Sequence, residues 1–309
     1  MKKIKLLVPL MGITALSACA IPLVGCGTKP QPEPEAKDFN TDPWSTIIYY
    51  ANKGGDTLAK AYGYDDASEL IGKTREVTLT QDDTGEDVEL TYKVRVIGVD
   101  HDSVSDTTKA ALTFQFIDLI SDSQYEEFIW LPYSSEYSNV WSSSDLRVFA
   151  NGKLLSWFPE EVATGLKSVS KTTVVSSQDG SAQPTSETTN DKIFVPSLVE
   201  VYGEDAIDNS KYAFSELDKE WYFKEGTQYE FFADKLDLED PYDPETSLLK
   251  KGLGEYSDFE DYWLRTPTMS PEGGDYPWLY TWNITDGGSA MEVNTGDTEE
   301  SSIAPCFCI

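Results

Sequence analysis

YWLRTP, residues 262–267, places an arginine among bulky apolar side chains. Its arginine, Arg265, is one of only four in the chain and stands among Trp263, a leucine and a proline. A guanidinium in such surroundings lies on a nearly buried surface and needs a carboxylate or carbonyl partner, because burial of an unpaired charge is costly. We therefore predict that Trp263 and Arg265 are structural anchors.

The next regular stretch after this anchor, residues 278–294, reads as a hairpin. Trp278, Tyr280, Trp282 and Ile284 alternate with other residues, Asp-Gly-Gly at 286–288 turns the chain, and 289–294 returns. Alternation places Tyr280 and Trp282 on one face, either in the core or on an aromatic face that binds sugars or peptides. Tyr280 and Trp282 are therefore the candidate ligand-binding residues.

Further strands are predicted upstream and at the C-terminus. Residues 88–96 alternate apolar and polar side chains, with expected partners at 111–117 and, across a turn at 82–87, at 76–80. The last residues, 303–309, also alternate, and we expect them to close the body as an edge strand.

Helix signals lie between these strands. Residues 44–62 have helical spacing that Gly54-Gly55 interrupts, a helix is expected after an N-cap at Ser143 or Ser144, another begins near Pro159, and a short one spans 228–233. Residues 171–177 look extended, and the Ser/Thr/Gly-rich segment 176–190 reads as a loop. Since strands and helices do not alternate regularly, we predict a single compact α+β domain built on antiparallel strands. Trp141 and Arg147, beside the predicted N-cap, form a second pair of anchors.

The N-terminus predicts a bacterial lipoprotein. Three lysines precede an apolar run that ends in Leu-Val-Gly-Cys at 23–26, a lipobox in which Cys26 becomes the lipidated first residue. Cys19 also fits the pattern, but cleavage there would leave an apolar mature end. We therefore expect a signal peptide at 1–25, a Pro/Glu-rich tether at 26–43 and the domain at 44–309, anchored by lipid to the cell membrane on its extracytoplasmic face.

The charge limits the partners. With 54 acidic and 24 basic residues the formal net charge is -30, so nucleic acid and bare anionic membrane would be repelled. An unknown extracellular glycan or protein is the expected partner, and the membrane is contacted through the lipid anchor only.

No residue cluster predicts catalysis, a metal or a cofactor. His101 is the only histidine, and a structural polar contact is favoured for it over a general base. Cys306 and Cys308 are expected to pack as small apolar residues rather than to bind a redox metal. The acidic run 234–245 fails the spacing of an EF-hand loop and reads as solvated, so a calcium site is the less favoured alternative.

Several segments together resemble the bacterial domain of unknown function DUF6273. They are VRVIGVDHD (94–102), LTFQ (112–115), WSSSDLR (141–147), DKIFVPSLVEVYG (191–203), EGTQYEF (225–231), YWLRTP (262–267) and APCFCI (304–309). The resemblance runs from about Trp44 to the last residue. It implies a secreted or prophage-associated protein without an assigned activity, and a fold related to the C-type-lectin-like and formylglycine-generating-enzyme-like folds.

We therefore expect a non-catalytic, lipid-anchored surface domain that binds an extracellular glycan or protein. The alternatives are an enzyme related to formylglycine-generating oxidases and a purely structural envelope protein. An enzyme should show thiols or a metal cluster inside a cleft, whereas a binding protein should show an aromatic and polar concavity without them.

Overall fold

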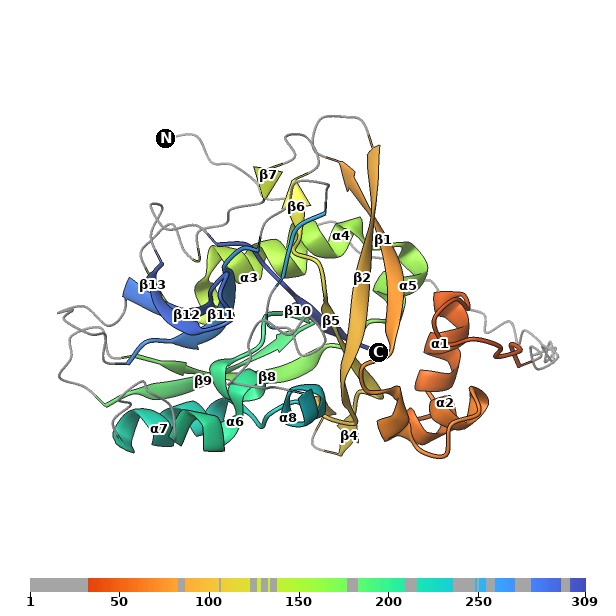
Figure 1. Ribbon diagram of the computed structural model, residues 1–309, viewed down its shortest axis with the longest axis horizontal. Helices are drawn as coiled ribbons and strands as arrows, with labels where there is room; N and C mark the ends of the chain where they lie inside the picture. The colour runs from red at the N-terminus through yellow and green to blue at the C-terminus, as the bar shows by residue number, and fades with distance from the viewer. Residues whose placement is uncertain are drawn as a thin grey trace, which may run out of the picture. The chain divides into compact units, whose positions relative to one another are not determined.

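A five-stranded antiparallel sheet and a three-stranded one organise the body of the protein in the computed structural model (Figure 1). The structure describes residues 33–82, 87–105, 107–122, 127–128, 133, 138–176, 183–208, 216–235, 248, 250–253, 259–269, 279–295 and 301–309. Residues Glu35–Ile309 form one compact unit. No helix in these ranges is both long and apolar enough to cross a membrane.

The strands follow the chain in this order: β1 (Thr74–Asp82), β2 (Asp87–Val99), β3 (Ser103–Ser105), β4 (Thr108–Lys109), β5 (Leu112–Phe116), β6 (Ser121–Asp122), β7 (Glu127–Phe128), β8 (Val169–Val175), β9 (Thr185–Asp191), β10 (Ile193–Phe194), β11 (Tyr262–Pro267), β12 (Tyr280–Ile284), β13 (Ala290–Asn294) and β14 (Cys306–Cys308). The large sheet has the order β1-β2-β5-β14-β10, and the second has the order β11-β12-β13. Strands β3-β4, β6-β7 and β8-β9 form separate pairs.

The helices are α1 (Trp44–Ala51), α2 (Gly55–Ala61), α3 (Asp145–Phe149), α4 (Leu155–Trp157), α5 (Glu160–Gly165), α6 (Leu198–Asp208), α7 (Glu216–Tyr222) and α8 (Glu230–Lys235). Short 3-10 turns, η1 (Ala67–Leu70), η2 (Trp141–Ser143) and η4 (Phe223–Glu225), and a π-helical turn, η3 (Ala150–Leu154), connect them. The predicted break between α1 and α2 is confirmed, and so is the cap at Ser144, whose hydroxyl accepts the backbone N–H of Arg147 at 3.1 Å.

The centre of the large sheet has one aromatic face and one polar face. Phe114 of β5 stacks on Phe307 of β14 at 5.3 Å, and Trp44 of α1 packs edge-on against Phe114 at 5.4 Å. On the other face, Thr113 pairs with Cys308 and Gln115 with Cys306. All five residues of β5 are buried. The predicted alternation is therefore correct, but both faces are covered by other parts of the protein.

Two expectations about strands are wrong. The segment 176–190 was predicted as a loop, yet its second half is β9, which pairs with β8 from Val169–Asp191 to Val175–Thr185. Its Ser and Thr side chains lie mostly at the surface, so they give no apolar alternation, while Thr172 and Thr188 face each other at 3.2 Å. The C-terminal strand β14 is not an edge strand, because it lies between β5 and β10.

Close packing and one special backbone conformation shape the helices. A Cβ atom at Gly165 of α5 would lie 2.5 Å from the Ile48 side chain of α1, so glycine lets these two helices approach. Gly203 interrupts α6 with φ 74°, and a Cβ there would lie 2.4 Å from Gln228. Glycine is therefore needed at position 165 for the close contact, and at position 203 for both the positive φ and the contact with Gln228.

Candidate functional site

Arg265 of β11 lies at the centre of a buried ion cluster. Its Nη1 donates to Oε2 of Glu200 at 2.5 Å and to the carbonyl of Val195 at 3.0 Å. Its Nη2 donates to Oε1 of Glu200 at 2.8 Å and to the carbonyl of Glu225 at 2.9 Å. The two terminal nitrogens of the guanidinium thus bind the carboxylate of Glu200 on α6 and two backbone carbonyls. These bonds join the second sheet to the segments around α6 and η4.

The cluster continues from Glu200 to the polar face of the large sheet. The ammonium of Lys171, from β8, bonds to Oε1 of Glu200 at 2.9 Å, to the hydroxyl of Tyr229 at 2.8 Å, and to Asp102. Asp102 also accepts the hydroxyl of Thr113 at 2.5 Å. All of these side chains are buried. Burial opposes ionisation of Asp102 and Glu200, but the neighbouring cations hold the pKa of each carboxyl below its usual value.

Glu225 is the carboxyl that the cations do not fully compensate. It accepts the backbone N–H of Val174 at 2.9 Å and the hydroxyl of Thr266. Burial raises its pKa to about 7, against the opposing effect of Arg265. If all the cluster's acids were ionised, three carboxylates would face two cations, so a proton on Glu225 balances the buried charge.

Trp141 and Arg147 meet at a second buried carboxylate. The indole N–H of Trp141 donates to Oδ2 of Asp191 at 3.0 Å, and Nε of Arg147 donates to Oδ1 at 2.8 Å. Asp191 is fully buried at the end of β9. Trp263, on β11, is also fully buried and packs edge-on against Tyr133 at 5.8 Å. These side chains hold segments distant in sequence against one another.

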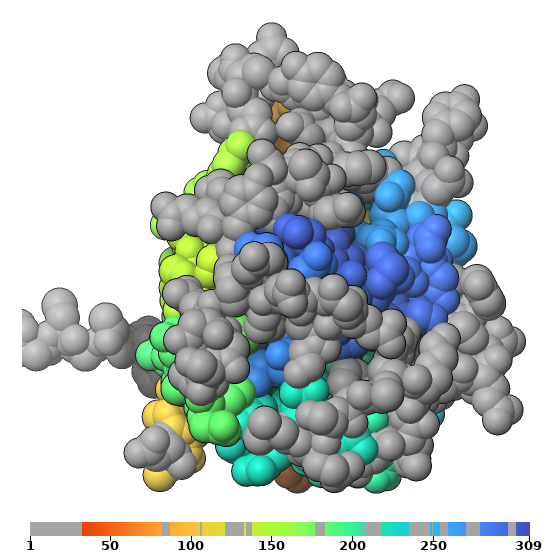
Figure 2. All heavy atoms as spheres, turned by 90° about the vertical axis from the view of Figure 1, so that its left-hand side faces the viewer, coloured from red at the N-terminus to blue at the C-terminus, as the bar shows by residue number. Residues whose placement is uncertain are grey.

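Tyr280 and Trp282 do not form an exposed aromatic face. Trp282 is only 2% exposed, and its indole N–H donates to the hydroxyl of Tyr222 at 3.3 Å. Tyr280 is half-buried at the start of β12. Residues of the second sheet, in blue, reach the surface shown in Figure 2. Met291 of β13 is 45% exposed. The burial of Trp282 favours a core role for its ring.

The histidine and the two C-terminal cysteines are held by structural contacts. His101 lies on Tyr229 with ring centroids 4.2 Å apart, and its Nδ1 is 3.3 Å from Oε2 of Glu230. Cys306 and Cys308 are free thiols without solvent exposure, and burial raises the pKa of each well above the ordinary value. Within the described ranges, no three His, Cys, Asp or Glu side chains are grouped so as to hold a metal ion. Of the acidic run 234–245, the residues from 236 to 245 lie outside the described ranges.

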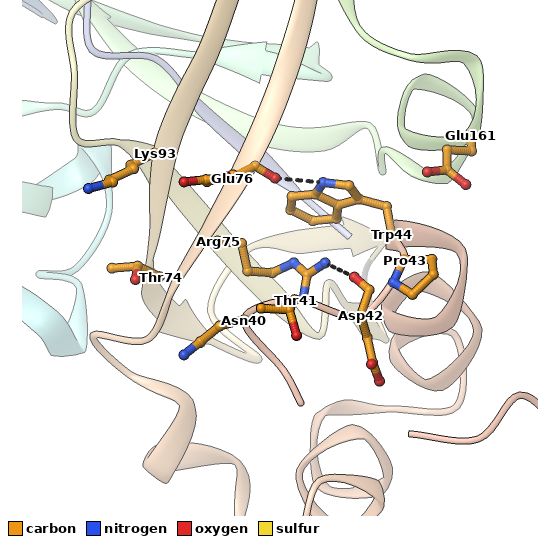
Figure 3. Close-up of a pocket in the computed structure, with 10 residues that line it drawn as sticks. All are labelled: Asn40, Thr41, Asp42, Pro43, Trp44, Thr74, Arg75, Glu76, Lys93 and Glu161. Carbon is orange, nitrogen blue, oxygen red and sulfur yellow. Dashed lines mark hydrogen bonds between the residues drawn. The ribbon is translucent and has the colours of Figure 1, made fainter. Parts of the chain in front are cut away.

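A surface pocket of about 500 Å³ lies beside the start of α1 (Figure 3). Its lining comes from the segment before α1, from β1 and β2, and from α5: Asn40, Thr41, Asp42, Pro43, Trp44, Thr74, Arg75, Glu76, Lys93 and Glu161. The indole N–H of Trp44 donates to the carbonyl of Glu76 at 3.0 Å, which fixes the ring at the pocket wall. Figure 3 shows the Arg75 side chain extending from β1 towards Asp42, whose backbone carbonyl it contacts.

Sequence reasoning missed Arg75 and most of the buried cluster. Glu200 stands inside the apolar run LVEVYG, and a lone acid in such a run is a signal for a buried partner. Lys171 and Asp102 carry no such signal, because each stands among polar neighbours. Arg75, Val77 and Leu79 are two residues apart on β1 and so share one face of the strand, and all three are buried. This spacing could have indicated an inward-facing arginine.

The comparisons with known proteins identify a family. A scan against family models matches residues 119–309 to a domain of unknown function, DUF6273. Searches of curated proteins and of solved structures found no match. The matched range contains Arg147, Asp191, Lys171, Glu200 and Arg265, whereas Asp102, Thr113 and most of the pocket precede it. The match spans more than half of the chain, and the protein therefore belongs to the DUF6273 family.

Proposed function

We propose that this protein is a bacterial lipoprotein, anchored through Cys26 on the extracytoplasmic face of the cell membrane, whose domain binds an extracellular glycan or protein without catalysing a reaction. The pocket beside Trp44 is the observation that carries the binding role. It is a concavity in which polar and charged side chains surround one aromatic ring, so it offers a ligand hydrogen bonds, charge and one apolar surface.

The chemistry of the buried groups supports binding over catalysis. The thiols of Cys306 and Cys308 are enclosed and their raised pKa disfavours the thiolate that a nucleophile or a soft-metal ligand needs. The ionisable groups around Arg265 are committed to one another and lie away from the residues that line the pocket. The enzyme alternative requires a cleft that opens onto the thiols.

Two experiments test the two halves of this proposal. For the anchor, Cys26→Ser should abolish incorporation of labelled palmitate and leave the precursor uncut, whereas continued labelling would move the site to Cys19. For binding, the intact chain in detergent is applied to a glycan array and to cell-wall material. Retention of a defined glycan or protein supports the binding role, and the absence of any retained ligand argues for the structural alternative.

A further inference from the structure

We infer that the pocket beside Trp44 binds the carboxylate group of a small ligand, and that Arg75 is the residue that receives it. This inference rests on the proposed binding function and specifies its ligand chemistry. It follows from three features of Arg75: its unpartnered donors, its lack of a carboxylate contact, and the rigid mount that holds its guanidinium in the pocket.

The first feature is a set of buried donors without acceptors. Arg75 is 4% exposed, and its Nη2 donates to the backbone carbonyl of Asp42. In the described part of the chain, its Nε and Nη1 are buried and have no hydrogen-bond partner. Unpaired buried N–H groups of a cation are unfavourable, so the folded protein gains free energy when an oxygen acceptor reaches them.

The second feature is the missing counter-charge. Arg265 and Arg147 each contact a carboxylate, that of Glu200 and that of Asp191. Among the described residues, Arg75 has no carboxylate oxygen within ion-pair distance. The carboxylate of Asp42 is turned to other donors, the backbone N–H of Lys37 at 2.8 Å and the hydroxyl of Tyr62 at 3.1 Å. A carboxylate supplied by a ligand would provide the missing counter-charge and accept a hydrogen bond from one of the two free nitrogens.

The pKa of Arg75 also indicates that its positive charge is poorly compensated. Loss of hydration lowers the pKa of Arg75 to about 10, and the nearby acids only partly oppose that effect. The negative charge around the guanidinium therefore does not fully compensate its loss of hydration.

The third feature is the rigid mount of the guanidinium. Its central carbon lies 4.6 Å from the ring centroid of Trp44 and 5.5 Å from that of Phe39. These rings restrict the arginine before any ligand arrives, which reduces the entropy lost on binding. Figure 3 shows Thr41 beside the guanidinium, whereas Asn40 points away from it, and both side chains are exposed. Because the free donors are buried, binding of the ligand requires the exposed Thr41 side chain to move aside.

The charged residues that line the pocket limit the other charges that the ligand can carry. Glu76 and Glu161 are exposed acids that line the pocket, and Lys93 is an exposed cation there. Asp42 is a third acid in the lining, and the three acids together disfavour a ligand with several negative charges. A monocarboxylate with neutral or zwitterionic remaining parts therefore fits best. A volume of about 500 Å³ suits such a small molecule. Acidic monosaccharides and the free C-terminus of an amino acid or short peptide both supply this chemistry.

The test measures binding of matched acids and neutral analogues to the intact chain in detergent by isothermal titration calorimetry. The acids are sodium glucuronate and N-acetyl-alanine, and the neutral analogues are glucose and N-acetyl-alaninamide. At least one acid is expected to bind at least tenfold more tightly than its neutral analogue. Failure of both acids to bind, or equal binding of acid and neutral analogue in both pairs, overturns the inference.

The variants assign the binding to Arg75. Arg75→Met is expected to weaken binding of the acid at least tenfold. Arg95→Met is the matched control, because Arg95 lies on the neighbouring strand, pairs with Thr74, packs over Phe231 and does not line the pocket. The control should bind like the parent, and equal loss in both variants overturns the inference. If Arg75→Met does not fold, Arg75→Lys applies the same criterion, since it keeps the charge but loses the fork of donors.

Failure of this inference is distinguishable from failure of the proposed function. If the parent retains a glycan or protein in the cell-wall screen but binds neither acid, the binding function stands and the carboxylate pocket is refuted. If the parent binds the acids but retains nothing in that screen, the pocket stands and the macromolecular partner is refuted.

Discussion

Replacing Arg265 with methionine is the most direct test of how the fold is held together. The substitution keeps an unbranched side chain but removes four hydrogen bonds, two of them to the buried carboxylate of Glu200. Lys171 still contacts Glu200 after the change, so the carboxylate keeps one cation. Breaking a buried ion pair by removing one partner typically costs about 3 to 5 kcal/mol. We therefore expect a loss of about 4 kcal/mol, a large share of the stability of an ordinary domain.

The assay is denaturant unfolding of the intact chain, followed by tryptophan fluorescence and circular dichroism. Lys224→Met is the matched control, because Lys224 contacts Glu220 at 3.8 Å on the surface, where an ion pair contributes about 1 kcal/mol or less. Adding Glu200→Gln to Arg265→Met should recover part of the loss, since it removes the carboxylate left short of a partner. If Arg265→Met unfolds at the same denaturant midpoint as Lys224→Met, the anchor role of Arg265 is refuted.

Three further predictions follow from the same contacts. Burial raises the pKa of Glu225 to about 7 in the folded protein, against 4.5 in the unfolded chain. Between pH 4.5 and pH 7 the folded state therefore holds a proton that the unfolded state has released. The parent should lose roughly 3 kcal/mol of unfolding free energy as the pH rises through this range. Glu225→Gln should lack that decrease in denaturant unfolding, and Lys250, whose pKa burial lowers to about 7, is common to both proteins and cancels in their difference. Cys306 and Cys308 should resist iodoacetamide in the native protein and react only after denaturation, as peptide mass spectrometry would detect; rapid native labelling of either would contradict their enclosure. Deleting Ser302–Ile309 removes β14 from between β5 and β10 and should abolish the cooperative thermal transition, whereas an unchanged melting curve would show that the sheet closes without it.

Local patterns in the sequence predicted most of the elements. The alternation at 88–96, the turn residues at 286–288 and the cap at Ser144 each act over a few residues, and each predicted element is present. The loop assigned to 176–190 failed because β9 pairs through polar side chains that leave no apolar period. The C-type-lectin-like arrangement stays a prediction, since no solved structure matches.

The site was less predictable than the fold because its residues meet only through long-range packing. Arg265 was identified from its apolar neighbours, but its partner Glu200 is 65 residues away, and Asp102 and Lys171 are 69 residues apart. Alternation placed Trp282 on a definite face of β12 without showing which face meets solvent. Arg75 became visible as a candidate only when the structure showed which of its donors have partners.

The compact unit Glu35–Ile309 extends beyond the range of the family match, and the buried cluster crosses that boundary. Residues 119–309 include β14, but its neighbour β5 ends at Phe116 and supplies Phe114, which stacks on Phe307. Asp102, which also precedes the match, contacts the ammonium of Lys171 that Glu200 shares. Without the segment before residue 119, β14 would present an unpaired edge and Lys171 would lose one of its two carboxylates. The N-terminal strands therefore complete both the sheet and the charge balance of the family domain, and the same strands form a wall of the pocket around Arg75.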